Sequence, residues 1–119
     1  MLLKRTIECP EFVAGDRCRL REVLHPRNDG GGMPFSLARA SVAPGEATLP
    51  HRLARHEAYY ILAGAGRMHV DDEARAVAPG DAILIPPGAE QWIENPGVET
   101  LQFIAIVGPP WRAQDEVVG

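Results

Sequence analysis

Two stretches with a similar internal design decide the fold of this chain. Residues 45–64 read GEATLPHRLARHEAYYILAG, and residues 80–95 read GDAILIPPGAEQWIEN. In each stretch a short apolar run lies between glycines and prolines, which mark turns. Neither stretch keeps the 3.6-residue apolar period that an amphipathic helix needs. Both therefore predict short β-strands joined by tight turns.

The same rhythm continues outward in both directions from these stretches. Short apolar runs alternate with turn signals such as Asn-Asp-Gly, Pro-Gly and Asn-Pro-Gly. The predicted strands are residues 19–25, 35–42, 59–63, 67–70, 75–78, 82–85, 91–94 and 100–107. Many short strands at 8–12-residue spacing are typical of an all-β sandwich or barrel. A double-sheet roll is favoured over an open sheet because it leaves fewer strand edges exposed.

The length of the chain suits one folded unit. It has 119 residues, of which 45% are hydrophobic and 24% are charged, close to an ordinary globular protein. That length supports one modest core but not a second one. We expect a single domain over residues 1–119, with a barrel core at about 19–107, an irregular or edge segment at 1–18 and a tail at 108–119. Within the tail, residues 108–111 are expected to fold back over the barrel, and residues 114–119 are expected to fray.

The charge balance excludes several classes of partner. Twelve Lys and Arg residues against 16 Asp and Glu residues give a formal net charge of −4. Nucleic-acid binding needs a basic face, and an acidic membrane surface attracts one, so neither partner is expected. The N-terminal sequence MLLKRTIE carries charge where a signal peptide needs apolar residues. We therefore expect a cytoplasmic protein in which Cys9 and Cys18 are free thiols.

The spacing of glycines and polar residues in the two opening stretches carries the functional information. The first stretch holds Gly45, His51, Glu57 and Gly64, and the second holds Gly80, Pro86, Gly88, Gln91 and Asn95. These residues resemble, with every spacing kept, the two motifs of the cupin superfamily: Gly-(x)5-His-x-His-(x)3–4-Glu-(x)6-Gly and Gly-(x)5-Pro-x-Gly-(x)2-His-(x)3-Asn. The resemblance is to the small single-domain cupin 2 type. It implies a double-stranded β-helix, or jelly-roll barrel, with one open mouth.

The resemblance also implies a metal site inside the barrel. In cupins the three histidines and the glutamate of the motifs usually hold a divalent metal. Here Leu53 replaces the second histidine and Gln91 replaces the last one. The implied ligands are His51, Glu57 and Gln91, whose side-chain oxygen is a weaker donor than imidazole. The ion could be Zn, Mn, Fe or Ni, held less tightly than in a cupin with complete motifs.

Two alternatives to this ligand set stay open. His56 precedes Glu57 and points the opposite way on a regular strand, but a loop or bulge at residues 52–55 would let it replace a missing ligand. Otherwise His51 and Glu57 form a hydrogen-bonded polar pair in a pocket that is empty or holds an organic ligand.

Three further residues are candidates for contact with a small-molecule ligand. Tyr59 shares a strand face with Glu57, and Ile93 shares one with Gln91, because residues two apart on a strand face the same side. Phe103 lies on the last long predicted strand. The alternative for the two aromatic residues is a position in the core.

These features predict a small cupin with a pocket inside the barrel. The favoured function is a metal-dependent enzyme, such as an isomerase, cyclase or oxygenase-like enzyme, acting on a small organic or sugar-like molecule. The alternative is a non-catalytic cupin that binds a small molecule without a tightly held metal. The resemblance further implies a homodimer, for which the outward positions Tyr60, Leu62 and Trp92 suit an interface.

Overall fold

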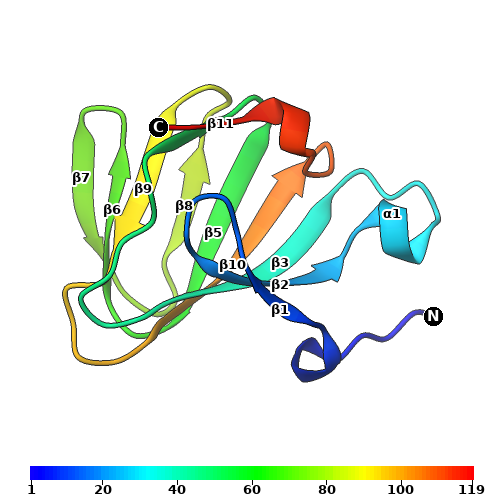
Figure 1. Ribbon diagram of the computed structural model, residues 1–119, viewed down its shortest axis with the longest axis horizontal. Coiled ribbons are helices and arrows are strands. Elements are labelled where there is room, and N and C mark those ends of the chain that lie inside the picture. The colour runs from blue at the N-terminus through cyan, green and yellow to red at the C-terminus, as the bar shows by residue number, and fades with distance from the viewer.

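Eleven strands in two antiparallel sheets form most of the structure, a computed structural model that describes residues 1–119 (Figure 1). The six-stranded sheet has the order β1 (Glu11–Val13), β2 (Arg19–Leu24), β3 (Ser36–Val42), β10 (Leu101–Gly108), β5 (His56–Ala63) and β8 (Ala82–Ile85). The five-stranded sheet has the order β11 (Glu116–Val118), β4 (His51–Leu53), β9 (Glu90–Glu94), β6 (Gly66–Val70) and β7 (Glu73–Val77). Because the chain crosses repeatedly between the sheets, the fold is an all-β jelly roll, as predicted.

Helical structure is limited to three short pieces: η1 (Thr6–Glu8), α1 (Pro26–Asp29) and η2 (Ala113–Asp115). None of them has the length and apolar character that a membrane-crossing helix requires.

The core lies between the two sheets and follows the alternation of the strands. On β10, Leu101, Phe103, Ala105 and Val107 are buried, while the residues between them are partly or fully exposed. On β5 the buried positions are Glu57, Tyr59 and Ile61. Met68 and Ile93 meet them from the five-stranded sheet. Each sheet therefore presents one face to the core and one to the outside.

The motif glycine Gly64 shows why the spacing of the first motif matters. Its φ of +79° lies in the left-handed region, and a Cβ there would come within 2.6 Å of the backbone oxygen of Thr100. Only glycine fits this turn between β5 and β6 beside the start of β10.

All eight predicted strands are present, and three short ones were missed: β1, β4 and β11. The expectation that residues 114–119 fray was wrong, because β11 pairs with β4 and places Glu116 opposite Leu53 and Val118 opposite His51. Three-residue strands show no readable period, and β11 is held by this pairing rather than by its own sequence. Cys9 and Cys18 are buried and free, as expected.

Candidate functional site

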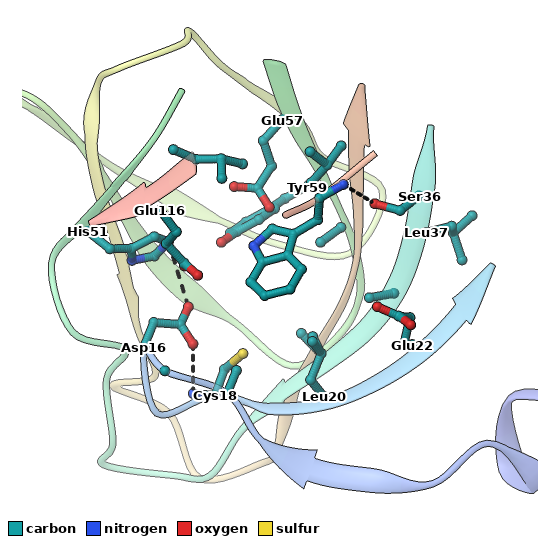
Figure 2. Close-up of a pocket in the computed structure, with 18 of the residues that line it drawn as sticks. Asp16, Cys18, Leu20, Glu22, Ser36, Leu37, His51, Glu57, Tyr59 and Glu116 are labelled. Carbon is teal, nitrogen blue, oxygen red and sulfur yellow. Dashed lines mark hydrogen bonds and ion pairs between the residues drawn. The ribbon is translucent and has the colours of Figure 1, made fainter. Parts of the chain in front are cut away.

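A cavity of about 350 Å³ lies inside the fold and is lined mainly by apolar side chains (Figure 2). Its walls come from β2, β3, β4, β5 and β10, together with the β1 region and the C-terminal segment. This size is at the small end of the range for ligand pockets in proteins. Among the ionisable side chains that line this largely apolar space are Asp16, His51, Glu57 and Glu116.

His51 is the histidine of the first motif, and its ring orientation is fixed from behind. It is 3% exposed, and its Nδ1 lies 2.8 Å from the backbone oxygen of Leu49. A carbonyl oxygen only accepts hydrogen bonds, so Nδ1 carries a hydrogen, and in the neutral form of the ring the lone pair lies on Nε2. That atom lies 3.7 Å from Oδ2 of Asp16. Nε2 of His51 is therefore available as a metal ligand on the side of Asp16, while Nδ1 bonds to the backbone, which is the arrangement typical of a metal-binding histidine.

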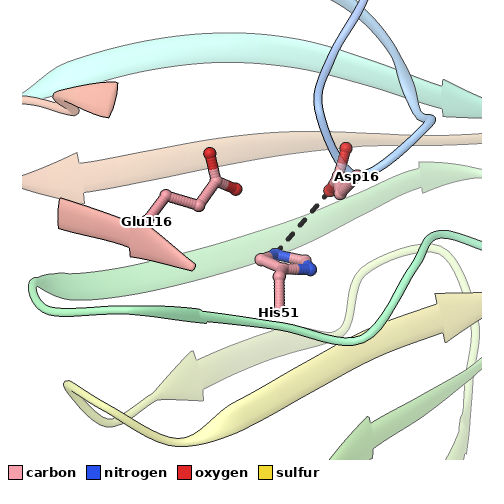
Figure 3. A group of neighbouring side chains, drawn as sticks. All are labelled: Asp16, His51 and Glu116. Carbon is pink, nitrogen blue, oxygen red and sulfur yellow. Dashed lines mark ion pairs between the residues drawn. The ribbon is translucent and has the colours of Figure 1, made fainter. Parts of the chain in front are cut away.

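Two carboxylates complete a cluster with His51 (Figure 3). Asp16 lies between β1 and β2, and its Oδ1 accepts a hydrogen bond from the backbone N–H of Cys18 at 3.1 Å. Glu116 begins β11, which pairs with the strand of His51. One donor atom from each of the three residues lies within 4.8 Å of the other two.

The electrostatics of this cluster favour a cation. Burial raises the pKa of Glu116, and the nearby charge of Asp16 raises it further, while His51 and a hydrogen bond from Trp111 lower it. Two carboxylates held together in a low-dielectric site repel each other, and a bound divalent ion would remove that cost. One imidazole nitrogen and two carboxylate oxygens are a suitable donor set for a first-row divalent metal. The triad Asp16, His51 and Glu116 could therefore hold a metal ion.

A second polar group lies deeper, between β5 and β9. The Tyr59 hydroxyl donates to Oε1 of Gln91 at 3.1 Å, and Nε2 of Gln91 donates to Oε1 of Glu57 at 2.8 Å. Burial raises the pKa of Glu57 to about 7, and the hydrogen bond from Gln91 opposes that rise. Tyr59 also packs on Phe103, with ring centroids 4.4 Å apart. The carboxyl group of Glu57 therefore lies between its hydrogen-bond partner Gln91 and the cavity.

The sequence-predicted site residues divide into three sets. His51, Glu57, Tyr59 and Phe103 all line the cavity. Gln91 and Ile93 are 1% and 0% exposed and lie behind its wall, with Gln91 bonded to Glu57 and Tyr59. His56 is exposed at the start of β5, on the opposite face from Glu57, and is not brought to the cluster. Metal binding by Glu57 and Gln91 stays a prediction, and Glu57 is not one of the three residues in the cluster around His51.

Sequence reasoning missed Asp16 and Glu116. Both lie outside the two motifs, in segments interpreted as an irregular N-terminus and a fraying tail. Their only sequence signal is that each is an acidic residue in a segment with some apolar neighbours, which is too weak to find them. The pairing of β11 with β4 and a hydrogen bond from Leu49 N to Asp16 O, at 2.7 Å, bring them to His51.

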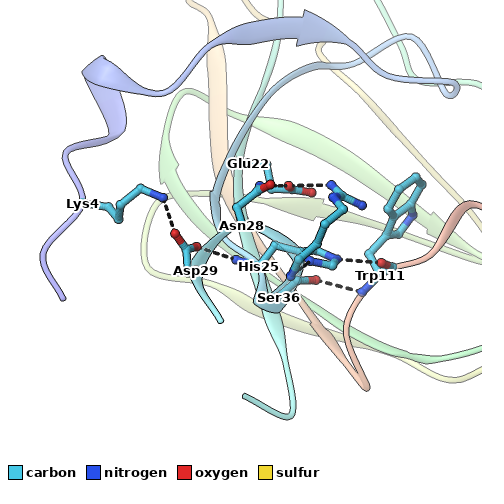
Figure 4. A network of polar contacts seen from close by, with 8 residues as sticks. Lys4, Glu22, His25, Asn28, Asp29, Ser36 and Trp111 are labelled. Atoms are coloured by element: carbon cyan, nitrogen blue, oxygen red, sulfur yellow. Dashed lines mark hydrogen bonds and ion pairs between the residues drawn. The ribbon is translucent and has the colours of Figure 1, made fainter. Parts of the chain in front are cut away.

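The C-terminal segment is fastened over the cavity at two points. The backbone N–H of Trp111 donates to Oγ of Ser36 at 3.0 Å, and its oxygen accepts from Nε2 of His25 at 2.9 Å (Figure 4). Farther along, Asp115 accepts from Arg55 at 2.5 Å and from Arg112 at 2.7 Å. These contacts hold Trp111 against the cavity and Glu116 beside His51.

The two antiparallel sheets and the interior cavity define a jelly-roll protein with its candidate site inside the barrel. A family model described as a cupin domain matches residues 38–107. The chain belongs to the cupin family.

Comparisons with known proteins agree with this assignment. The chain is 40% identical over 105 residues to an uncharacterized protein of Methanocaldococcus jannaschii, covering 87% of this chain and 83% of that protein. It is 30% identical over 105 residues to the mannose-1-phosphate guanylyltransferase ManC of Salmonella typhimurium, covering 82% of this chain but 22% of that enzyme. The similarity to ManC therefore concerns about a fifth of its length.

Solved structures share the fold. The crystal structure of a predicted oxalate decarboxylase from Thermotoga maritima superimposes with a TM-score of 0.79 and 22% identity, covering 91% of this chain and 99% of that one. At this identity the likeness shows the fold alone.

Proposed function

We propose that this chain is a metal-dependent cupin enzyme that acts on a small, mainly apolar organic molecule bound in the interior cavity. The observation that carries the proposal is the convergence of Asp16, His51 and Glu116 at the wall of a cavity that also contains Glu57. Three segments far apart in the sequence meet there, and each contributes one donor group to the cluster. Apolar side chains fill most of the remaining wall.

The residues present fit a divalent metal ion. His51 Nε2 faces Asp16, and the hydrogen bond of Nδ1 to the backbone oxygen of Leu49 leaves Nε2 as the ring nitrogen that can ligate a metal. Mn²⁺, Fe²⁺ and Zn²⁺ all accept mixed nitrogen and carboxylate ligands. When bound, such an ion supplies Lewis-acid polarisation of a substrate oxygen and leaves coordination positions open for it.

The remaining residues of the cavity have separate roles in this proposal. Phe103, Trp111 and the neighbouring apolar groups exclude water and hold the apolar part of the substrate. Glu57, with its pKa raised to about 7, holds or accepts a proton near neutral pH. The apolar lining favours a mainly apolar molecule over a sugar, which would need more hydrogen-bonding partners than this wall offers.

Metal titration tests the proposal. Isothermal titration of chelator-treated protein with Mn²⁺ or Zn²⁺ should give about one site per chain. We expect His51→Ala, Asp16→Asn and Glu116→Gln each to weaken binding by at least roughly tenfold, by analogy with the loss of metal-site partners. Glu73→Gln on the exposed strand β7 is the matched control and should bind like the wild type.

The titration also separates this function from the non-catalytic alternative. Replacement of two motif histidines by Leu53 and Gln91 favours that alternative. No measurable site for either ion in the wild type, or equal binding by Glu116→Gln and the wild type, would contradict the metal-dependent enzyme.

A further inference from the structure

The two carboxyl oxygens of Glu57 have different surroundings. Oε1 accepts the hydrogen bond from Gln91 at 2.8 Å. Oε2 has no hydrogen-bond partner in the protein. Every side-chain oxygen that is fully inaccessible does have a partner, so Oε2 is accessible. Glu57 lines the cavity, and Figure 2 shows its carboxyl group directed into it. Oε2 is therefore the oxygen that a bound ligand can contact.

The hydrogen-bond chain decides where a proton on Glu57 resides. Tyr59 has one hydroxyl hydrogen, which it gives to Oε1 of Gln91. This contact fixes the amide so that its NH₂ group points to Glu57. The carbonyl oxygen of a carboxylic acid accepts hydrogen bonds more readily than its hydroxyl oxygen, so Oε1, which accepts from Gln91, is the carbonyl oxygen. The protonated carboxyl therefore carries its hydrogen on Oε2, toward the cavity.

The charges around the cavity define what can accept that hydrogen. Asp16 and Glu116 repel an anion, and the only guanidinium group in the lining, that of Arg27, is paired with Glu22 at 2.7 Å. A neutral hydrogen-bond acceptor on an apolar molecule is not repelled by these carboxylates and does not need an unpaired cation. Tyr59, Phe103 and Trp111 supply flat aromatic surfaces for a ring.

We propose that Glu57 donates a hydrogen bond from its cavity-facing oxygen to a neutral carbonyl group, so that the ligand class is small aromatic or cyclic ketones and aldehydes. Gln91 and Tyr59 are positioning residues that direct this hydrogen into the cavity. The inference deepens the proposed function by naming the substrate class, and it rests on that proposal only for the cavity being the ligand site.

Replacement of Glu57 by glutamine tests the donor directly. In Glu57→Gln the side-chain oxygen accepts from Gln91 and the NH₂ group faces the cavity, which reproduces the donor at every pH. Glu57→Met has a similar shape and no donor. The probes are acetophenone and α-methylstyrene, which have the same shape but only the first of which has a carbonyl oxygen. Binding is measured by ligand-observed NMR on chelator-treated protein.

At pH 6 the wild type and Glu57→Gln should bind acetophenone equally. Glu57→Met should bind it roughly 3- to 10-fold more weakly, which corresponds to one neutral hydrogen bond. Binding of α-methylstyrene should be the same in all three proteins. Equal acetophenone binding by Glu57→Met and the wild type would overturn the inference, and so would a loss of binding in Glu57→Gln.

The pH dependence gives a second readout. As the pH rises from 6 to 8, the affinity of the wild type for acetophenone should fall, and the affinity of Glu57→Gln should stay constant. The other titratable groups near Glu57 are Asp16, Cys18, His51, Tyr59 and Glu116. All five are present in both proteins, so the difference between the two profiles belongs to Glu57. Identical profiles would overturn the inference.

Tyr59→Phe tests the positioning role. Without the hydroxyl, the amide of Gln91 can turn around, and Glu57 can then donate to Gln91 instead of to the ligand. Acetophenone binding should fall while α-methylstyrene binding is retained; unchanged acetophenone binding would refute the role of Tyr59. Because no metal is present in these experiments, the carbonyl site and the metal site can fail independently.

Discussion

The side-chain amide of Gln91 donates a hydrogen bond to the carboxyl group of Glu57 at 2.8 Å, across the space between β9 and β5. The cupin motifs suggested both residues as metal ligands, and in the structure they bind each other. The cluster that could hold a metal lies beside them and takes only His51 from the motifs. The cavity thus has two polar groups with separate chemistry.

Replacement of Gln91 by methionine should destabilise the protein by about 1–3 kcal/mol, the cost of leaving buried polar groups without partners. The change removes the acceptor of Tyr59 and the donor to Glu57 at the same time. The loss should be greater at pH 8 than at pH 5, because the amide stabilises the ionised form of Glu57. Urea unfolding at both pH values measures it. Gln114→Met, at an exposed position, is the control, and an equally small effect of both changes would contradict the prediction.

The stability of the protein should fall as pH rises through the range in which Glu57 ionises. Its pKa is about 7 in the folded protein and near the ordinary 4.5 when unfolded. Between these values the folded state binds more protons than the unfolded state, so stability decreases with pH. The loss from Glu57 amounts to about 3 kcal/mol when complete. Glu116, whose pKa is also raised, acts in the same direction.

Urea unfolding of metal-free protein at pH 5, 6, 7 and 8 checks this dependence. Glu57→Gln should show a flatter profile and exceed the wild type in stability at pH 8. A wild-type profile as flat as that of the variant would show that Glu57 ionises normally.

The fold was readable from the sequence because most strands carry a clear signal. Residues 100–107 alternate between buried and outward positions on β10, and the Pro-Gly pairs mark the turns between strands. The short strands β1, β4 and β11 carry no such pattern. Their pairing depends on contacts between segments distant in the sequence, which a local pattern cannot contain.

The site was only partly readable for the same physical reason. The spacing of the motifs identified His51 and Glu57 as residues that point into one cavity, and both line it. Asp16 and Glu116 approach His51 only after the N-terminal segment and β11 have docked on β4. Leu53 and Gln91 indicated that the usual ligand set had changed, but not which residues had joined it.

Asp115→Asn should weaken metal binding without touching the cluster. Hydrogen bonds from Arg112 and Arg55 lower the pKa of Asp115 to about 2 and hold the segment that leads into β11. Without the charge, β11 should open more often and Glu116 should lie beside His51 for less of the time. We expect a 2- to 5-fold weaker Mn²⁺ affinity, about 0.5–1 kcal/mol, together with faster amide exchange at residues 116–118.

Two controls separate this effect from others. Asp72→Asn, an exposed carboxylate in the turn between β6 and β7, should change neither quantity. Faster exchange with unchanged Mn²⁺ affinity would exclude Glu116 from the metal site, whereas unchanged exchange would show that the ion pairs of Asp115 do not hold β11.

We propose a homodimer that forms through the outer face of the six-stranded sheet. Tyr60 and Leu62 on β5, Ile106 on β10 and Leu84 on β8 are exposed there, and Ala58 pairs in register with both Ile106 and Leu84. Trp92, which the sequence grouped with Tyr60 and Leu62, belongs to the other sheet. Its ring stacks on that of His69, with ring centroids 3.6 Å apart. The three therefore do not share one surface.

The double variant Leu84→Glu/Ile106→Glu places like charges in the middle of this face and should convert the dimer into a monomer. Light scattering coupled to size-exclusion chromatography measures the mass, and circular dichroism confirms that the variant is folded. Trp92→Ser is the control and should remain dimeric, because its surface lies on the opposite sheet. A wild type that is monomeric at 100 µM would refute the dimer. If Trp92→Ser became monomeric while the double variant stayed dimeric, the contact would instead lie on the five-stranded sheet. The reason is that apolar area stabilises an interface only where it is buried.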